Sequence, residues 1–393
     1  GKSVCYQLSA ILQPAISFVV CPIKSLMYDQ KADLDSAYFT RVNHITSDDD
    51  GEDKEQIQKE FSLGKYFFIF ISPERFQLNT FRQYFSSVNE EFNIAYAVVD
   101  EVHCLSEWGH DFRTSYLNLS STIQRLCSNF SFLGLTATAS INVLKDIQIE
   151  FGIKQENVKT PVDFTRKELE FIVLDDENNK KGVINAKLGE LIDSIDALQS
   201  KGSNTKSGII FTPTVNGSNG CYPLSQQLSQ QFGAEIKFYS GSVPKIEGQP
   251  IMSETQFEAY KKNVQSEFKK NKFSLLTATK AFGMGVNKGN IHYTFHYGIP
   301  GSMESLYQEA GRAGRDKGKF QGSKAQCYVL LTKTTNQDAL RKIWARETSF
   351  SNFLDSAVDY SGQVIKQKLF SRYEKRQFQE DGLTLRKGLI SKT

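Results

Sequence analysis

Short apolar runs alternate along this chain with longer stretches in which apolar residues recur at helical spacing. The run from Ile94 to Val99 is β-branched and aromatic, which is typical of a buried strand, whereas residues 25–36 have a helical pattern. Alternation of this kind predicts parallel α/β sheets. In the first part of the chain, the runs that predict strands are 16–21, 67–71, 94–99 and 131–135.

The alternation stops between residues 152 and 181, where polar and charged residues surround Pro161. This break is typical of a connector, with one strand expected at 171–174. Beyond it, strands are expected at 208–211, 235–239, 273–278, 292–297 and 326–331. After Thr332 the pattern turns helical and charged, and we recognise no chemistry in it. We therefore expect a first lobe over residues 1–155, a second over residues 156–332 and a short helical C-terminal extension over residues 333–393.

Composition limits the classes of protein to which the chain can belong. Of its 393 residues 39% are hydrophobic, which is enough for the cores of two domains. The longest apolar runs, such as 66–71, are too short to cross a bilayer, so we expect no membrane partner. Six cysteines without C-x-x-C spacing argue against a disulfide framework and a four-cysteine zinc site. We therefore expect an intracellular protein, cytoplasmic or located in the nucleoid or nucleus.

The formal net charge of +3 is close to balance. A nucleic-acid partner would therefore be held by a local basic groove, because no globally basic surface is available to attract it.

Candidate phosphate-binding residues stand at the start of the chain. Gly1-Lys2-Ser3 is the tail of the motif G-x-x-x-x-G-K-[ST]. In that motif backbone amides surround the phosphates, the lysine reaches the β and γ oxygens, and the hydroxyl binds Mg²⁺. The tripeptide alone has a high false-positive risk. The start of the motif is not in view, so we expect the natural chain to begin before Gly1, and a targeting segment there is not excluded.

Two adjacent carboxylates supply the second half of this candidate site. Asp100 and Glu101 directly follow the strand-like run 94–99, and open parallel sheets present ligand groups at the carboxyl ends of their strands. One carboxylate can hold Mg²⁺ while the other positions water. Together with Lys2 and Ser3, they predict a nucleotide-hydrolysis site in which Ser3 and one of the two carboxylates bind the metal.

The segment Gln308 to Arg315 carries a further set of groups. Arg312 and Arg315 are three residues apart, one helical turn, so we expect both side chains to point the same way. An arginine brought to the γ-phosphate from a separate lobe stabilises the charge that develops during phosphoryl transfer, and contributes on the order of a thousandfold or more in rate. Hydrolysis would then require the lobes to close. The competing interpretation is a salt-bridged helix terminus.

With these residues in place, the chain resembles the RecQ-type DNA helicases of helicase superfamily two over roughly residues 1 to 332. The most family-specific segment is DEVHCLSEWGHDFR, which resembles a metal-binding motif joined to an aromatic-rich loop. The other motifs, in the family's order, are GKSVCYQLSA, VVCPIKSLMYDQ, ISPERF, GLTATAS, GIIFTPT, TATKAFGMGVNKGNIHY and YQEAGRAGRDKG. The resemblance implies two tandem RecA-like lobes with parallel sheets, and ATP and Mg²⁺ as cofactors.

The resemblance also implies roles for single residues. Ser3 and Asp100 would bind Mg²⁺, and Glu101 would orient the attacking water. His103 and Thr136 would couple the nucleotide state to lobe movement. Arg315 would be the main finger arginine. The residues implied in catalysis are Lys2, Asp100, Glu101, His103, Gln308, Arg312 and Arg315. The residues implied at the nucleotide are Gly1, Lys2, Ser3, Gly283, Gly285 and Asn287.

Single-stranded or tailed duplex DNA is the implied partner, with 3′→5′ movement along one strand. Trp108, Phe112 and Arg113 resemble the loop that senses single-stranded DNA; an aromatic face stacks on any base, and an arginine accepts phosphate. Hydroxyl and cationic side chains at strand ends are expected to hold the DNA backbone without reading its sequence. These are Lys24, Ser25, Arg75, Thr212, Thr279 and Lys280. Protein partners would bind flanking domains or the C-terminal extension.

Several positions depart from the family pattern. Glu107 stands where glutamine is usual, and Asn287 where aspartate is usual. Residues 216–223 and 243–255 look like insertions. Because no cysteine follows Cys327, residues 334–393 cannot form the four-cysteine zinc module that many family members carry.

Two alternatives from other functional classes stay open. The first is a nucleic-acid-stimulated ATPase that remodels protein–nucleic-acid complexes without processive unwinding, and comparing DNA with RNA as stimulator would identify it. The second is a silent DNA-binding scaffold. The Asp100-Glu101 pair and the two arginines argue against silence, since a scaffold has no physical need for those charges together.

Overall fold

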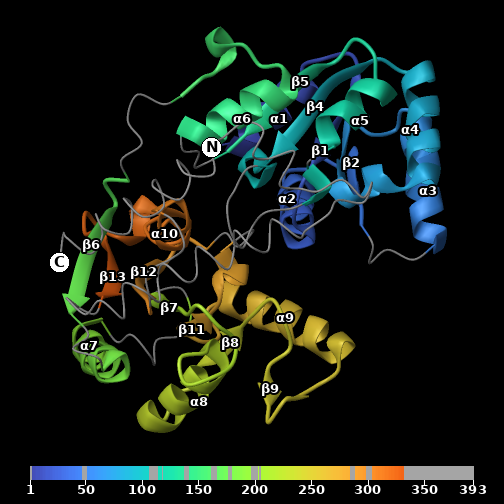
Figure 1. Cartoon of the computed structure of the whole chain (residues 1–393). Coiled ribbons are helices and arrows are strands. Elements are labelled where there is room, and N and C mark those ends of the chain that lie inside the picture. Colours follow the sequence, from blue (N-terminus) through green and yellow to red (C-terminus); the bar gives the residue numbers. More distant parts are fainter. Residues whose placement is uncertain are drawn as a thin grey trace, which may run out of the picture. The chain divides into compact units, whose positions relative to one another are not determined.

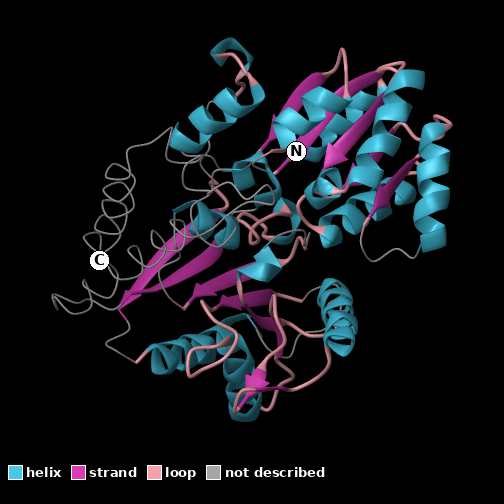
Figure 2. Ribbon diagram, turned by 45° about the vertical axis from the view of Figure 1, so that its right-hand side comes forward, coloured by secondary structure: helices cyan, strands magenta, loops and turns pink. Residues whose placement is uncertain are grey.

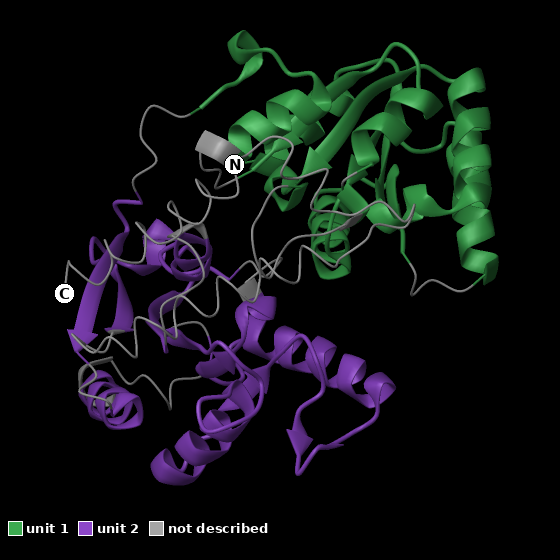
Figure 3. Cartoon of the chain, in the orientation of Figure 1, with its two compact units in different colours: residues 1–160, 350–374 green, residues 161–349, 375–393 purple. Residues whose placement is uncertain are grey.

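The computed structural model divides the described part of the chain into two compact units. The first unit runs to Thr160 and the second begins at Pro161 (Figure 3). The described residues are 2–46, 51–105, 114–116, 118–136, 141–160, 166–175, 179–195, 202, 205–283, 288–297 and 303–331. The domain limits expected at residues 155 and 332 remain predictions, and the expected helical extension, residues 333–393, lies outside the described residues.

The first unit is built on a five-stranded parallel sheet with the order β2-β3-β1-β4-β5 (Figure 1). Its strands are β1 (Ile16–Val20), β2 (Val42–Ile45), β3 (Phe68–Ile71), β4 (Ile94–Asp100) and β5 (Ser131–Leu135). The continuous apolar runs are therefore confirmed as strands. Strand β2 escaped prediction because its two central residues, Asn43 and His44, are polar.

Helices cover both faces of this sheet because successive side chains of a strand point to opposite sides. On β1, Phe18 and Val20 pack into the core shared with helices α3 to α6, whereas Val19, and Cys21 just after the strand, pack into the core shared with α1 and α2. The helices are α1 (Lys2–Ile11), α2 (Lys24–Ser36), α3 (Gly51–Ser62), α4 (Asn79–Glu91), α5 (Leu119–Leu126) and α6 (Ile141–Phe151). Short 3₁₀ helices span Pro73–Gln77, Val102–Leu105, Thr114–Tyr116 and Gln155–Asn157.

The second unit contains a six-stranded sheet with the order β6-β13-β12-β7-β11-β8, and all its strand pairs are parallel (Figure 2). Its strands are β6 (Leu169–Asp175), β7 (Ser207–Phe211), β8 (Lys237–Tyr239), β11 (Leu275–Ala278), β12 (Ile291–His296) and β13 (Ala325–Leu331). Each strand expected in this part of the chain is present. The predicted α/β class, with parallel sheets in two successive lobes, is therefore confirmed.

Two cores flank the second sheet as well. One is lined by α7 (Lys180–Ile195) and α8 (Cys221–Phe232), and the other by α9 (Glu254–Lys269) and α10 (Met303–Ala310). Helix α9 begins at a capping box, in which Ser253 accepts from the Gln256 amide while the Gln256 side chain accepts from the Ser253 amide. Short 3₁₀ helices span Lys280–Gly283 and Lys317–Lys319.

A small antiparallel hairpin, β9 (Lys245–Ile246) and β10 (Gln249–Pro250), lies between β8 and α9 in sequence. Its turn residues, Glu247 and Gly248, both have positive φ, at 51° and 83°, which suits a two-residue hairpin turn. The amide of Lys245 donates to Oδ1 of Asn216 at 2.8 Å. The two segments that resemble insertions, residues 216–223 and 243–255, are thereby joined to each other.

Most cysteines belong to these cores. Cys21, Cys104, Cys127, Cys221 and Cys327 are buried, whereas Cys5 on α1 is exposed. Among the helices in the described ranges, none is both long and apolar enough to span a bilayer.

Candidate active site

The candidate residues of the first unit gather at one edge of its sheet. The last residue of β1, Val20, is paired with Ile71 of β3 and Val99 of β4, and Asp100 is paired with Leu135 of β5. Because the strands are parallel, their carboxyl ends meet at this edge. The segments that follow them carry Lys24 and Ser25, Arg75, Glu101 and Thr136.

Asp100 is the buried carboxylate of this edge, with only 3% of its surface exposed. Its Oδ1 accepts from the Glu101 amide at 2.9 Å, and its Oδ2 accepts from Nε2 of Gln30 at 3.4 Å. Burial, together with the neighbouring Glu101 carboxylate, raises the pKa of Asp100 to about 6, although Lys2 acts in the opposite direction. Burial and the second carboxylate thus both disfavour the charged form of Asp100, and a cation at this edge would stabilise that form.

Glu101 leaves the strand in a left-handed backbone conformation, with a φ of 48°. Its Oε1 lies 2.7 Å from Nζ of Lys2, the first residue of α1, and its Oε2 lies 3.3 Å from Nδ1 of His103. Lys2 is thus placed beside the carboxylate pair, as the hydrolysis site requires. Ser3 follows it in the first turn of α1, where free backbone amides favour an anion.

His103 joins this group to β5. Its side chain is buried, and its Nδ1 lies 2.8 Å from Oγ1 of Thr136, the residue after β5. Lys2, Glu101, His103 and Thr136 therefore form one continuous chain of polar contacts. The structure brings together the two residues, His103 and Thr136, that the resemblance implied as a coupling pair.

Gln30 and Tyr6 are members of this site that the sequence reasoning missed. Gln30 is a buried polar residue of α2, and the Tyr6 hydroxyl on α1 donates to its Oε1 while Gln30 donates to Asp100. Buried polar groups need such partners. The signal was a polar side chain on the core-facing side of a helix, which does not by itself identify the partner.

Three of the predicted DNA contacts lie on the same edge, in the part of the first unit that the structure describes. Lys24 and Ser25 begin α2, immediately after β1, and Arg75 lies in the 3₁₀ helix after β3. Arg75 donates from Nη2 to the carbonyl oxygen of Thr46 at 2.6 Å. Roles for these residues remain predictions.

The second sheet presents a comparable edge. Ala278, the last residue of β11, is paired with Phe211 of β7 and Tyr239 of β8, so the predicted contacts Thr212 and Thr279 come to adjacent strand ends. The Thr212 amide donates to Ala278 at 2.8 Å, and the Thr279 amide to Tyr239 at 3.0 Å. Lys280 and Gly283 are the two ends of the 3₁₀ helix that follows.

Ser240 also belongs to this edge and was not predicted. It directly follows β8, and its hydroxyl donates to the carbonyl oxygen of Ser242 at 2.8 Å. A serine directly after a predicted strand, at 235–239, was the available signal.

Gln308 lies in helix α10, but Arg312 and Arg315 do not, because the helix ends at Ala310. The expectation that the two arginines share a helical turn is therefore wrong. The segment that follows, Gly311–Arg315, is called the arginine loop below. Gly314 has a φ of 67°, a left-handed conformation that cannot continue the helix. The directions of the two arginine side chains are therefore set by the conformation of this loop and not by helical spacing.

Helix α10 is attached to the sheet by a buried pair. Nδ1 of His296, the last residue of β12, lies 2.8 Å from Oε2 of Glu309, and the His296 ring is stacked on Phe211. Glu309 is the neighbour of Gln308 on α10, so this pair holds the part of the helix that carries Gln308.

Some predicted site residues lie outside the described residues. They are Gly1, Gly285 and Asn287 of the implied nucleotide site and Trp108, Phe112 and Arg113 of the implied DNA-sensing loop.

Comparison with known proteins extends this picture. The DEAD/DEAH box helicase family matches residues 1–147, and the helicase conserved C-terminal domain matches residues 186–317. The ATP-dependent DNA helicase RecQ of Bacillus subtilis is 30% identical over 332 residues, which are 84% of this chain and 49% of that protein. The ATP-dependent DNA helicase Q5 of Rattus norvegicus is 32% identical over 327 residues, 80% of this chain and 31% of that protein.

Solved structures agree on the fold. The Mycobacterium smegmatis helicase Lhr, in a structure bound to ssDNA and AMP-PNP, matches 84% of this chain and 42% of that protein with a TM-score of 0.59 and 16% sequence identity. The chain spans half or less of the two curated relatives. The two lobes are thus RecA-like in fold, and by its motifs and relatives the chain belongs to the RecQ-type helicases of superfamily two.

Proposed function

We propose that this chain is the motor of an ATP-dependent DNA helicase, which couples ATP hydrolysis to 3′→5′ movement on single-stranded DNA. The observation that carries the proposal is the contact chain from Lys2 through Glu101 and His103 to Thr136, beside the buried Asp100. The relatives named as ATP-dependent DNA helicases support the choice of DNA.

The residues fit Mg²⁺. Mg²⁺ prefers oxygen ligands, and the hydroxyl of Ser3 and the carboxylate of Asp100 are the donors that we propose. Burial and the neighbouring Glu101 carboxylate raise the pKa of Asp100, and a divalent cation would stabilise its charged form. When bound, the ion neutralises charge on the nucleotide phosphates.

The protein groups have separable tasks. Lys2 pairs with Glu101 at 2.7 Å, and we propose that nucleotide phosphate replaces this carboxylate as the partner of Lys2. Glu101 is then available to accept a hydrogen bond from the attacking water. Its second oxygen stays next to His103, so a change at Glu101 is transmitted to Thr136 at the end of β5.

The second unit supplies the remaining groups. We propose that Gln308 contacts the γ-phosphate or the water, and that Arg312 and Arg315 stabilise the charge of the transition state. We propose Gly283, Gly285 and Asn287 as further nucleotide contacts. Thr212, Thr279 and Lys280, at the strand ends of this unit, would hold the DNA backbone.

The test is the steady-state rate of ATP hydrolysis by the full chain with Mg²⁺, first without nucleic acid and then with single-stranded DNA, duplex DNA and single-stranded RNA. We expect strong stimulation by single-stranded DNA and none after Lys2→Ala. Lys31→Ala is the matched control, because Lys31 forms a surface pair with Asp35 at 2.7 Å. Stimulation by RNA alone would support the remodelling ATPase, and DNA-stimulated hydrolysis in Lys2→Ala would contradict the proposal.

A further inference from the structure

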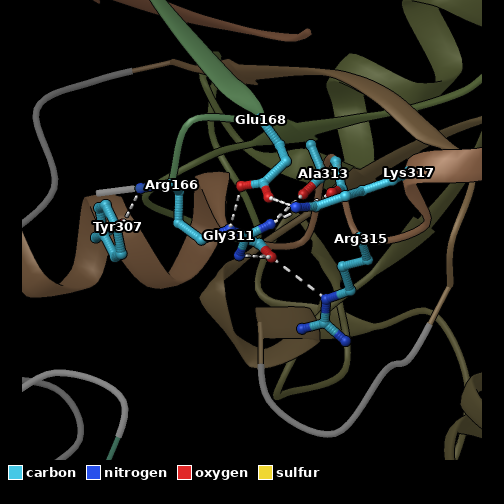
Figure 4. Close-up of polar contacts among 8 residues, drawn as sticks. Arg166, Glu168, Tyr307, Gly311, Ala313, Arg315 and Lys317 are labelled. Carbon is cyan, nitrogen blue, oxygen red and sulfur yellow. Dashed lines mark hydrogen bonds and ion pairs between the residues drawn. The ribbon is translucent and has the colours of Figure 1, made fainter. Parts of the chain in front are cut away.

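Arg166, which lies just before β6, contacts the arginine loop about 145 residues away in sequence. Its Nη1 donates to the carbonyl oxygen of Gly311 at 3.4 Å, and its Nη2 donates to the carbonyl oxygens of Ala313 at 3.2 Å and Gly314 at 3.5 Å (Figure 4). One guanidinium group therefore holds carbonyl oxygens at both ends of the loop that carries Arg312.

The backbone of Arg166 is bound to α10, the helix that precedes the arginine loop. Its amide donates to the hydroxyl of Tyr307, a residue of α10, at 3.0 Å. Carbonyl groups at the end of a helix lack helical partners, and a cation there is favourable. Arg166 supplies both donors and charge at this place, so it holds α10 and the loop in one arrangement.

Arg166 is itself held in place. Its Nε lies 3.3 Å from Oε2 of Glu168, whose other oxygen lies 2.9 Å from Nζ of Lys317 (Figure 4). Lys317, together with Arg166, lowers the pKa of Glu168 to about 2, so the carboxylate stays charged. Glu168 thus joins Arg166 to Lys317, which follows the arginine loop in sequence.

The arginine loop is packed closely against Glu168. A side chain at Gly314 would bring its Cβ within 3.2 Å of both Cβ and the carbonyl oxygen of Glu168. The positive φ of Gly314 and this tight contact both disfavour a side chain at this position.

Arg166 and Arg315 share an acceptor. The Nε of Arg315 donates to the carbonyl oxygen of Gly311 at 3.3 Å, the same oxygen that accepts from Arg166 (Figure 4). The direction of this carbonyl group therefore depends on one arginine and orients the other.

We infer that Arg166 is a positioning residue for hydrolysis: it fixes the arginine loop, and through it Arg312 and Arg315, in the geometry that phosphoryl transfer needs. This inference rests on the proposed function. A group displaced by about 1 Å can lose about a hundredfold in rate, so a residue that never touches nucleotide can still control turnover.

The experiment compares Arg166→Ala and Arg166→Lys with Arg41→Ala. Arg41 is a matched control, since it also donates to backbone carbonyl oxygens, those of Lys65 at 2.8 Å and Gly64 at 2.9 Å, but in a loop without motif residues. We expect Arg166→Ala to lower kcat of DNA-stimulated hydrolysis by about tenfold to a hundredfold with little change in KM for ATP, because the phosphate-binding residues are elsewhere.

Arg166→Lys should fall nearly as far, because one ammonium group cannot span the carbonyl oxygens that the guanidinium reaches. If the alanine variant fails to fold, the lysine variant carries the test alone. In an Arg312→Ala/Arg315→Ala background, removal of Arg166 should change kcat no further, because residues that act through one another are not additive. A wild-type kcat in both Arg166 variants, or a full additional loss in that background, would overturn the inference.

Amide hydrogen exchange of residues 308–316 separates this inference from the proposed function. The Gly311 and Gly314 amides donate to Tyr307 and Ile291, and without Arg166 their exchange should accelerate, whether or not the chain hydrolyses ATP. Faster exchange in a chain without ATPase activity would contradict the proposed function, and would show that Arg166 fixes the loop but not for hydrolysis. Exchange unchanged from Arg41→Ala would refute the positioning role, whatever the ATPase rate.

Discussion

At the scale of single residues, Glu101 is the most constrained position of the site. A residue other than glycine in the left-handed region is uncommon and costs about 1 to 3 kcal/mol, which the surrounding contacts must offset. Glu101 adopts this conformation with a φ of 48° and contacts Lys2 with one oxygen and His103 with the other. The strained backbone conformation directs the carboxylate between Lys2 and His103.

Glu101→Gln tests this placement, because it keeps the shape of the side chain and removes its charge. We expect kcat for ATP to fall by roughly a hundredfold to ten-thousandfold, the range for loss of a general base. The unfolding midpoint should change little. Glu190→Gln, at an exposed pair with Lys187, is the control. A variant that still hydrolyses ATP at the wild-type rate would remove Glu101 from the mechanism.

Lys288 is a second constrained residue, far in sequence from the carboxylates. It is 4% exposed, and its ammonium group donates to the carbonyl oxygen of Phe268 at 2.7 Å and to the side chain of Asn271. Burial, followed by the charge of Lys319, lowers the pKa of Lys288 to about 7. The folded chain therefore releases this proton more readily than the unfolded chain does.

The sign of the pH dependence follows. Between pH values of about 7 and 10.5 the unfolded chain binds more protons at this lysine than the folded chain, so its contribution to the free energy of unfolding rises with pH. We expect Lys288→Met to flatten this rise in denaturant unfolding of the second unit, and Lys324→Met, at an exposed position, to leave it unchanged. An identical pH profile in Lys288→Met and wild type would show that folding does not lower the pKa of this lysine.

At the scale of elements, the arginine loop shows how a turn replaces a helix. Residues 303–310 are helical, but Gly311 and Gly314 follow, and Gly314 is left-handed. The sequence spacing suggested a shared helical face for Arg312 and Arg315 because three residues make about one turn. The two glycines were the signal for the loop, since glycine after a helical pattern commonly ends it.

Gly314→Ala isolates the loop's contribution, with Gly233→Ala as its matched control. Both glycines are left-handed, with φ of 67° and 60°, but a Cβ at Gly233 would meet no atom within 4 Å, whereas at Gly314 it would crowd Glu168. Each alanine should cost about 1 to 2 kcal/mol of unfolding free energy, and Gly314→Ala more than Gly233→Ala. ATP hydrolysis should fall in Gly314→Ala alone. Equal rates in both variants would show that loop shape does not control turnover.

Elements differed in how well the sequence predicted them. Strands with unbroken apolar runs, such as 94–99, were found because burial on both faces demands such residues. Strand β2 was missed because Asn43 and His44 interrupt its apolar pattern. The contacts of Arg166 could not be predicted, since nothing local to residue 166 identifies partners in the arginine loop. Contiguous site residues such as Asp100 and Glu101 were predicted, because chain neighbours at a strand end share one edge.

At the scale of the whole molecule, charge determines how the proposed DNA binding could work. The net charge of +3 is small, so DNA binding would depend on a limited number of local contacts. The strand-end residues that we propose as contacts occur in both units, with Lys24 in the first and Lys280 in the second. Each would neutralise one phosphate.

The salt dependence of binding measures these contacts. For single strands, the slope of log affinity against log salt concentration changes by about 0.7 per phosphate neutralised. We expect Lys24→Ala and Lys280→Ala each to reduce the slope by about 0.7, measured by fluorescence anisotropy of a labelled oligonucleotide. Lys31→Ala, on the same helix as Lys24, should not alter it. Unchanged slopes in both lysine variants would place the DNA elsewhere.

The buried cysteines have a practical consequence for spectroscopy. Burial raises the pKa of Cys127 and Cys221 to about 12, and that of Cys327 to about 11, so these thiols form little of the thiolate that reacts with maleimide dyes. Cys5 is the exposed exception. With Cys5 replaced by serine, a cysteine introduced at Lys245 on the hairpin would react selectively with a dye, and its fluorescence would report on the second unit while ATP turns over.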